Sequence, residues 1–269
     1  MSTHPVVLVT GAGKGLGRAI CELFRSKSYT VVATDYDLSL VDDLNNKEGY
    51  ITTAIDVSST SSCIAAASFI QEQCGRLDII VNNAGIIGYF PTVEMDPEKI
   101  IYHYQVNTFG ALRTTHACLD LLAASQGRVI NISSESYRLR TPFQAYQSTK
   151  LALEGLSDVM RRELALLNVH VATIRPGAIK TDLFEAMLNI ENPVPNGRLA
   201  AGFKRFVNGL ASNTPKKVST PPEMAELIYH AATDPKKKPH YEKNNMLALK
   251  IAAVLPSSVV DKMVGKLLK

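Results

Sequence analysis

The chain has 269 residues, of which 46% are hydrophobic and 20% charged, so it contains enough apolar material for one core. The formal net charge is only +4, and no long lysine or arginine run precedes residues 236–238, which argues against a nucleic-acid-binding protein. No stretch reaches the ~20 apolar residues of a membrane-spanning helix, and the six histidines show no H-x-x-x-H arrangement, so we expect neither a membrane span nor a metal site.

The cysteines and the start of the chain indicate a compartment. The four cysteines form no C-x-x-C pair, and three of them lie on helical stretches with apolar neighbours, so we expect buried, reduced thiols. The first predicted strand begins almost at Met1, which leaves no room for a signal peptide. These features predict a cytoplasmic protein.

Short apolar runs alternate with helical patterns along the chain. We expect strands at 5–10, 30–34, 50–54, 77–81, 128–132 and 169–175, with a weaker seventh at 239–242. Most of these runs are continuously apolar, as is typical of parallel strands buried on both faces. Helices are expected at 15–27, 38–46, 59–74, 97–124 with a break, 144–167 and 221–232. This order predicts one α/β, doubly wound domain over 1–269, with a mostly seven-stranded parallel sheet and helices on both faces.

The first predicted strand ends in a glycine cluster, with Gly11, Gly15 and Gly17 leading into a pattern of helix formers. A strand, a glycine turn and a helix start form the context that a dinucleotide site requires. Glycines let the backbone approach a pyrophosphate, and the free N–H groups of the helix N-terminus face its charge. The spacing is not G-x-G-x-x-G, and a tight turn alone is the alternative explanation.

Tyr146 and Lys150 are four residues apart in a predicted helix, so both side chains point the same way. A phenol has a reference pKa near ~10 and is a poor base at neutral pH. A nearby ammonium and a cationic nicotinamide ring both favour the phenolate, which would prepare the pair for proton transfer. Any helix can carry Tyr and Lys at this spacing, so the pair gains its meaning from the glycine turn upstream.

Thr10-Gly-x-x-x-Gly-x-Gly followed by Tyr-x-x-x-Lys resembles the short-chain dehydrogenase/reductase family, which has a Rossmann fold. The resemblance runs from Val6 to about Thr181, some two thirds of the chain. Four further motifs fit in order: Asp56-Val57, Asn82-Asn83-Ala84-Gly85, Asn107 within Val-Asn-Thr, and Pro176-Gly177 with Thr181 beyond.

The resemblance implies a role for each motif. Asp56-Val57 would contact the adenine, the Asn-Asn-Ala-Gly element would brace the sheet, and the segment from Pro176 would touch the nicotinamide carboxamide. The implied catalytic residues are Asn107, Ser134, Tyr146 and Lys150. The implied coenzyme-binding residues are Thr10, Gly11, Lys14, Gly15, Leu16, Gly17, Asp35, Asp56, Val57, Asn83, Ala84, Gly85, Tyr146, Lys150, Pro176, Gly177, Ile179 and Thr181. Lys150 would lower the pKa of the phenol, and Asn107 would hold a water on the proton path.

Two serines compete for the position beside the tyrosine. Ser133 and Ser134 lie 13 and 12 residues before Tyr146, and the family uses both separations. The shorter separation resembles the branch that contains retinol and 17β-hydroxysteroid dehydrogenases. We favour Ser134, with Ser133 as the alternative.

The coenzyme preference depends on two side chains. Asp35 ends the second strand, close to the ~20-residue offset at which an acidic side chain binds the ribose 2′-hydroxyl. Its carboxylate would repel a 2′-phosphate, which favours NAD. Lys14 favours NADP, because family members that use NADP often carry a basic residue there, although it also fits a solvated turn. We expect NAD, with NADP as the alternative.

Apolar residues surround the predicted strand ends on the substrate side. They are Tyr89, Phe90, Tyr137, Leu139 and Phe143, followed by Leu183, Phe184, Met187, Leu188, Ile190, Phe203, Phe206, Val207 and Leu210 in a predicted lid over 183–215. Such a lid favours a small hydrophobic alcohol or carbonyl substrate, similar to a steroid, a retinoid or a fatty chain. The alternative is that these residues pack on one another or on a partner subunit.

The segment 243–269 is expected to form a helical extension with an apolar stripe opposite Lys262, Lys266 and Lys269. A basic amphipathic helix of this kind lies peripherally on a membrane or packs on protein, and we favour protein. The family resemblance also implies a homodimer or homotetramer.

Three functions of different classes follow. The first is an NAD(P)(H)-dependent oxidoreductase that interconverts a secondary alcohol and a ketone or aldehyde. The second is a catalytically idle regulatory protein that binds nicotinamide coenzyme, but its usual signature, a lost Tyr or Lys, is absent here. The third, a nucleotide-sugar epimerase or dehydratase, usually has a longer chain and a G-x-x-G-x-x-G turn. We favour the first, with substrate and reaction direction open.

Overall fold

The computed structural model describes residues 3–182, 185, 190, 196–212 and 217–268. Its centre is a seven-stranded sheet in the order β3-β2-β1-β4-β5-β6-β7, in which every neighbouring pair is parallel. The strands are β1 (Val6–Thr10), β2 (Thr30–Asp35), β3 (Tyr50–Ala54), β4 (Ile79–Asn82), β5 (Arg128–Ile132), β6 (His170–Pro176) and β7 (His240–Lys243). The expected doubly wound α/β fold is confirmed.

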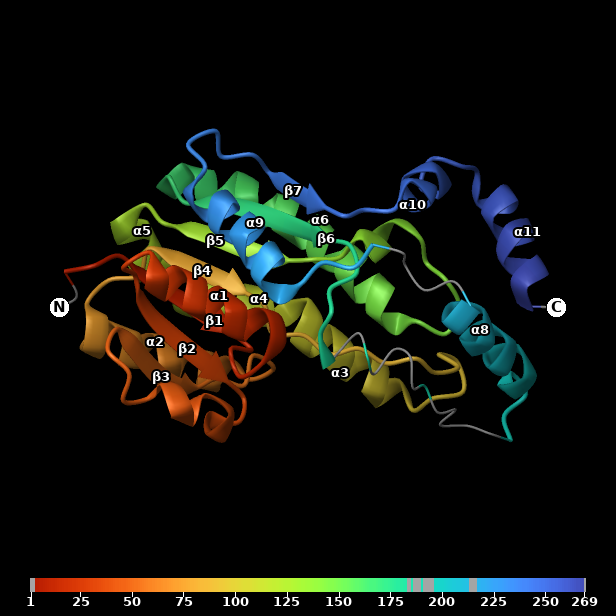
Figure 1. The fold of residues 1–269 in the computed structure, drawn as a ribbon, viewed down its shortest axis with the longest axis horizontal. Helices are drawn as coiled ribbons and strands as arrows, with labels where there is room; N and C mark the ends of the chain where they lie inside the picture. The colour runs from red at the N-terminus through yellow and green to blue at the C-terminus, as the bar shows by residue number, and fades with distance from the viewer. Residues whose placement is uncertain (1–2, 183–184, 186–189, 191–195, 213–216, 269) are drawn as a thin grey trace.

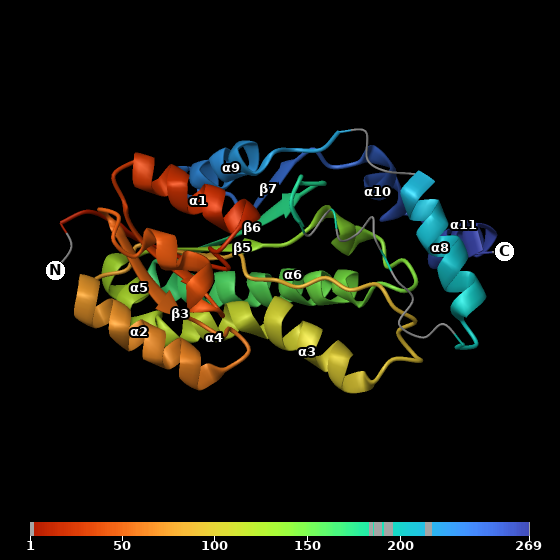
Figure 2. The same cartoon turned by 60° about the horizontal axis from the view of Figure 1, so that its bottom comes forward.

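Helices cover both faces of the sheet (Figures 1 and 2). One face carries α1 (Gly15–Ser26) and α9 (Pro221–Thr233), and the other carries α2 (Thr60–Cys74), α3 (Pro97–Asn107), α4 (Phe109–Ala117), α5 (Leu119–Ser125) and α6 (Ala145–Leu164). Side chains of β1 alternate between two apolar clusters, Val7 and Val9 facing α1 and Val6 and Leu8 facing α2. Both faces of β1 are therefore buried, which explains its continuous apolar run.

The expected break in the helix at 97–124 is confirmed, and it positions a site residue. Asp96 caps α3 by accepting from Glu98 N, and Pro97 occupies the first turn. The helix then breaks at Thr108, whose hydroxyl donates to Thr149 O at 2.9 Å. This bond across to α6 holds Asn107, the last residue of α3, beside α6.

The α-helix expected at 38–46 is wrong. The segment forms a 3-10 helix, η1, over Leu38–Leu44. Its sequence is rich in Ser, Asp and Asn, which compete for backbone hydrogen bonds and favour caps and turns over helix interiors. Asp37 illustrates this by accepting from Ser39 N at 3.0 Å.

The C-terminal part continues beyond the sheet as α8 (Ala200–Ser212), α10 (Leu247–Ala252) and α11 (Ser257–Leu268). Helix α11 lies alongside α8 at one end of the molecule (Figure 1), and Arg205 Nε donates to Leu268 O at 2.6 Å. Of the predicted lid, 183–184, 186–189 and 191–195 lie outside the described residues, as do 213–216. Within the described part of the chain, none of the helices combines the length and apolarity that a bilayer span demands.

Candidate active site

The glycine turn between β1 and α1 has no room for side chains. Gly11 and Gly15 adopt φ of +65° and +54°, the left-handed region that favours glycine. A Cβ on Gly17 would lie 1.9 Å from Gly11 O, and one on Gly13 would lie 2.6 Å from Leu40 Cβ. Gly13 belongs to this turn although the sequence motif did not include it. The run of glycines was the available signal.

The N-terminus of α1 suits an anion. Lys14, at the N-cap, makes no side-chain cap hydrogen bond, and the first turn contains no acidic residue. Its backbone N–H groups and the positive end of the helix dipole therefore fit a pyrophosphate. Leu16 is buried in the core beneath, so it offers backbone rather than side chain to a ligand.

A hydrogen-bonded clamp joins β1 to β4 at the point where the strand order reverses. Thr10 Oγ1 accepts from Asn83 N at 3.1 Å and from Ala84 N at 3.0 Å. Asn83 Nδ2 donates in return to Thr10 O and Gly11 O, both at 3.0 Å. In open α/β sheets ligands bind at this switch point, so these residues fix the floor of the crevice.

Asp35 is buried at the end of β2, directly beside the glycine turn. Its Oδ2 accepts from Gly13 N and its Oδ1 from Tyr36 N, both at 2.9 Å. The carboxylate therefore supports the turn. Lys14, by contrast, is 70% exposed and forms an ion pair with Asp182 at 3.3 Å.

Asp56 and the segment after β6 lie at the edge of the crevice at the strand ends. Asp56 Oδ1 accepts from both the amide and the hydroxyl of Ser58, at 2.8 and 2.6 Å, which fixes an exposed turn. After Pro176, Gly177 N donates to Lys243 O at 2.9 Å, and Ile179 forms a bridge to Ser219. The segment then returns over the glycine turn, where Thr181 Cγ2 would contact a Cβ on Gly15 at 3.4 Å.

Tyr146, Ser134 and Lys150 meet at the end of β5 and the start of α6. Lys150 is 4% exposed, its Nζ donates to Ile132 O at 2.7 Å, and it lies 5.6 Å from the centre of the Tyr146 ring. Burial raises the pKa of the Tyr146 phenol to about 12, and the nearby Ser134 hydroxyl opposes that shift. Burial lowers the pKa of Lys150 to about 8, and Glu154 opposes that shift.

The two serines have different surroundings. Ser134 caps the short 3-10 helix η2 (Glu135–Arg138) by accepting from Ser136 N at 3.2 Å, and its hydroxyl is near enough to the Tyr146 phenol to lower the pKa of that phenol. Ser133 is buried, and its Oγ has no hydrogen-bond partner among the described residues. The geometry therefore brings Ser134, and not Ser133, to the tyrosine.

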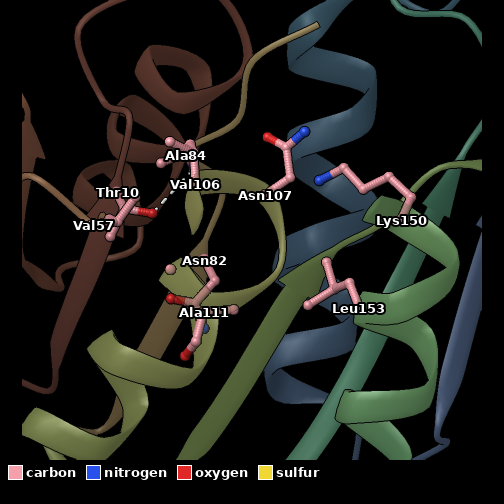
Figure 3. A pocket seen from close by; sticks show the side chains of 10 residues that line it. Thr10, Val57, Asn82, Ala84, Val106, Asn107, Ala111, Lys150 and Leu153 are labelled. Atoms are coloured by element: carbon pink, nitrogen blue, oxygen red, sulfur yellow. Dashed lines mark hydrogen bonds between the residues drawn. The ribbon is translucent and has the colours of Figure 1, made fainter. Parts of the chain in front are cut away.

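Asn107 is held rigidly next to Lys150 (Figure 3). Its Oδ1 accepts from Ile86 N at 2.8 Å, and its Nδ2 donates to Ile86 O at 2.8 Å and to Thr149 Oγ1 at 3.1 Å. Between Asn107, Lys150 and the Thr10 end of β1 lies an internal cavity of about 10 Å³, the size of one water molecule. Gly85 keeps this region open, since its Cβ would lie 3.3 Å from Asn107 Oδ1.

A second chain of polar side chains supports the site and was missed in the sequence. Asn82 Nδ2 donates to Asn131 Oδ1, and Asn131 Nδ2 donates to Ser157 Oγ, both at 2.8 Å. Thr149, the partner of Asn107, was missed as well. The usable signal is that Asn82 ends β4, Asn131 is the last residue but one of the neighbouring β5, and the two stand opposite each other in register.

The aromatic residues predicted on the substrate side lie in different surroundings. Phe143 packs against Phe203 and Phe206 of α8, with ring centres 5.3 and 5.5 Å apart. Tyr89 belongs to the same cluster. Burial raises the pKa of Tyr89, and the nearby Tyr146 phenol adds to that shift. Phe90 packs on His103 instead, and Tyr137 lies between the guanidinium groups of Arg138 and Arg175.

Comparison with known proteins agrees with this geometry. A family model described as short chain dehydrogenase matches residues 5–191. An NADPH-dependent 3-dehydrocapnine reductase from Ornithobacterium rhinotracheale is 31% identical over 97% of this chain and 96% of that enzyme. The 17-beta-hydroxysteroid dehydrogenase type 6 of Mus musculus is 32% identical over 69% of this chain and 60% of its own length.

A solved structure shares the whole fold. The crystal structure of a short-chain dehydrogenase from Streptomyces avermitilis superposes with a TM-score of 0.78 at 26% identity, covering 98% of this chain and 96% of that one. The strand order, the glycine turn and the Tyr-x-x-x-Lys helix occur together in the described residues. The chain belongs to the short-chain dehydrogenase/reductase family of oxidoreductases, in a branch similar to the retinol and 17-beta-hydroxysteroid dehydrogenases.

Proposed function

We propose that the protein is an NAD(P)(H)-dependent oxidoreductase that interconverts a secondary alcohol and a ketone or aldehyde. The observation that carries the proposal is the meeting of Ser134, Tyr146 and Lys150 at the strand ends, next to a glycine turn that fits a pyrophosphate. A catalytically idle protein has no need of this set, so we do not propose that alternative.

Side chains of the protein would transfer the proton to and from the substrate oxygen. A bound nicotinamide would supply or accept the hydride. Ser134 would hold the substrate oxygen, and Tyr146 would give it a proton during reduction or remove one during oxidation. Burial keeps the phenol protonated at neutral pH, since it raises the pKa to about 12. Lys150 would supply the positive charge that makes proton removal accessible, because most of it is protonated below its pKa of about 8.

Replacing Tyr146 by Phe tests the proposal directly. The variant keeps the ring that packs under Lys150 but loses the hydroxyl. We expect kcat to fall by about 10²–10⁴-fold, the usual contribution of general acid–base catalysis. Coenzyme binding, followed by fluorescence titration, should stay within about twofold of the unmodified protein. Appreciable turnover by the variant would assign proton transfer to another group.

The coenzyme is proposed to be NAD, because the Asp35 carboxylate lies where a 2′-phosphate would approach. Two observations support NADP as the alternative. Lys14 stands exposed at the mouth of the turn, and the bacterial relative is named NADPH-dependent. The charge of Asp35 is buried and fixed, whereas that of Lys14 is solvated, so Asp35 has the larger electrostatic effect.

The substrate is proposed to be hydrophobic. Support comes from the aromatic cluster of Tyr89, Phe143 and Phe203 beside Tyr146, and from a hollow of about 470 Å³ next to α8. The hollow is lined by Ile190, Ala200, Ala201, Phe203, Lys204, Val207 and Asn208. The mammalian relative is named for a hydroxysteroid, which is a hydrophobic secondary alcohol. Assaying NADH and NADPH formation across steroid, retinoid, fatty and small secondary alcohols would define the class.

We infer a homo-oligomer in a reducing compartment, which is the cytoplasm. Large apolar side chains are exposed on the outer faces of α3, α4 and α6, namely Ile101, Tyr102, Phe109, Leu112, Leu151 and Val159. The four cysteines are free and buried, as suits reducing conditions. Light scattering would give the number of subunits.

The C-terminal extension offers a second surface. Its described residues expose Leu247, Ile251, Val254 and Met263, while α11 contacts α8. We infer that this surface packs on protein, with a peripheral contact with anionic lipid as the alternative. Sedimentation with liposomes of the full chain and of a form ending at Pro256 would test it, and equal sedimentation would remove the idea.

A further inference from the structure

A set of charged side chains, buried at its α6 end, connects α6 with the C-terminal extension, and the proposed chemistry does not use it. Arg175 on β6 grips Glu154 on α6, with Nε 3.1 Å from both carboxylate oxygens and Nη2 2.7 Å from Oε2. Arg175 Nη1 also lies 3.4 Å from Glu242 Oε1 on β7. Glu242 in turn pairs with Arg138 and, at 2.8 Å, with Lys250 of α10. We call these five side chains the α6–β7 network.

The α6 end of the network is shielded from water, whereas Lys250 at the other end is 46% exposed. The side chains of Glu154 and Arg175 are only 8% and 14% exposed. The guanidinium groups of Arg175 and Arg138 both contact the ring of Tyr137, 4.9 and 4.8 Å from its centre. Buried ion pairs pay a large desolvation penalty and often add little to stability.

Glu154 lies one helical turn beyond Lys150, on the same face of α6. Lys150 is buried, and Ile132 O is the acceptor that its Nζ reaches. Glu154 and Tyr146 are the titratable groups that face Lys150 from α6. The neighbours from other elements are neutral: Thr10 of β1, Asn82 of β4 and Asn107 of α3.

Two opposing effects therefore act on the lysine. Burial favours the neutral amine and lowers the pKa of Lys150, and the Glu154 carboxylate favours the ammonium and raises it, with a net value of about 8. A carboxylate has this effect only while it is oriented, and the two-point grip of Arg175 fixes the orientation of Glu154. The neighbouring Glu242 is kept charged by its own partners: despite burial, hydrogen bonds from Lys250 and Arg138 lower its pKa to about 2.

We propose that Glu154, oriented by Arg175 and the rest of the α6–β7 network, is a positioning residue that keeps Lys150 in its ammonium form. The inference rests on the proposed function, because a charged Lys150 matters for turnover only if Tyr146 exchanges a proton. Glu154 touches neither substrate nor coenzyme; it acts through Lys150.

The pH profile of kcat/KM is the main test. In the unmodified protein, activity should decline as Lys150 loses its proton above about pH 8. In Glu154→Gln the ammonium loses its stabilising charge, so the decline should begin about one pH unit lower. At pH 8 that shift converts to roughly a fivefold loss of activity. Glu154→Asp, which keeps the charge, should recover most of it.

Arg175→Met should shift the profile in the same direction as Glu154→Gln. Glu154 then loses the grip that orients it, so its stabilising effect on the Lys150 ammonium weakens and the decline should move to lower pH. In the double variant Glu154→Gln/Arg175→Met the profile should match that of Glu154→Gln, because Arg175 acts on Lys150 through Glu154. A structural role alone would lower activity in all three variants without moving the profile. An unchanged profile in Arg175→Met, or a further shift in the double variant, would overturn the proposal.

Asp158→Asn is the matched control. Asp158 pairs with Arg161 at 3.0 Å on the same helix, but this pair is more exposed and lies two turns from Lys150. Its loss should leave the pH profile unchanged within experimental error. A shift in Asp158→Asn equal to that in Glu154→Gln would show a general charge effect and would also overturn the proposal.

A readout without turnover separates this proposal from the proposed function. Lysine labelled with carbon-13 at the ε position reports its own titration by NMR, and Lys150→Arg identifies the signal of Lys150. We expect the Lys150 titration to move to lower pH in Glu154→Gln and not in Asp158→Asn. If the protein turned over none of the tested alcohols, the proposed function would fail while this titration still decided the role of Glu154. Identical titrations in the unmodified protein and Glu154→Gln would refute that role.

Discussion

The two ends of the candidate site are built by different means. The coenzyme half, made of β1, β2, β4 and the start of α1, is fixed by backbone geometry: positive φ at two glycines and the clamp between Thr10 and Asn83. The substrate half, made of Phe143, α8, α10 and α11, is held by aromatic side chains and leaves Leu247 and Val254 71% and 82% exposed. A backbone constraint accepts few residue types, whereas a packed cluster accepts many. The coenzyme half should therefore be intolerant of substitution and the substrate half permissive.

Alanine at two glycines gives the largest expected contrast. A Cβ at Gly17 would lie 1.9 Å from Gly11 O, a backbone atom that cannot move away. Gly17→Ala should weaken coenzyme binding by at least about 10²-fold and lower the free energy of unfolding by about 2 kcal/mol or more. Gly265, in α11, has nothing within 4 Å of its Cβ position, so Gly265→Ala should raise that free energy by about 0.5–1 kcal/mol. Fluorescence titration and urea unfolding measure both, and equal effects would break the comparison.

Ser133 and Ser134 lie between the two halves, and substituting each of them shows which hydroxyl takes part in the reaction. Ser134→Ala removes the hydroxyl beside the Tyr146 phenol that is proposed to hold the substrate oxygen, so kcat/KM should fall about 10²-fold. Ser133→Ala removes a buried hydroxyl that has no partner among the described residues, so its kcat/KM should change by less than about threefold. Steady-state kinetics of the two variants gives the answer. The reverse order would reassign the active hydroxyl.

The smallest expected effect concerns coenzyme choice. Asp35→Asn keeps an oxygen that accepts from Gly13 N but removes the charge near the expected ribose. The ratio of kcat/KM with NADP to that with NAD should rise about tenfold or more, because the like-charge repulsion of a 2′-phosphate is lost. Lys14→Ala serves as the opposite control and should lower the ratio. An unchanged ratio in Asp35→Asn would remove Asp35 as the determinant.

Features that depend on local sequence signals could be predicted from the sequence. The seven strands and the broken helix around Asn107 followed from apolar runs and caps, which are local signals. The 3-10 helix at Leu38–Leu44 was not predicted, because the spacing of apolar residues does not show which hydrogen bonds the Asp and Ser side chains form.

The hydrogen-bond partners that lie far apart in the sequence could not be predicted for another reason. The pairing of Asn82 with Asn131 and of Glu154 with Arg175 joins residues 49 and 21 positions apart. Such contacts depend on sheet register and on side-chain rotamers, neither of which leaves a periodic pattern in the chain. The placement of Ser134 at the phenol also needed the structure, because the sequence spacing left two serines open.

The burial of all four thiols has a practical consequence for experiments. Cys21, Cys63, Cys74 and Cys118 are shielded, and burial raises the pKa of each, for Cys118 to about 12. Thiolates are the reactive form, so these sites should resist alkylating dyes under native conditions. A single cysteine introduced at the exposed Met263 of α11 would then carry a fluorophore selectively and report on the surroundings of the C-terminal extension, and the native cysteines would not have to be replaced first.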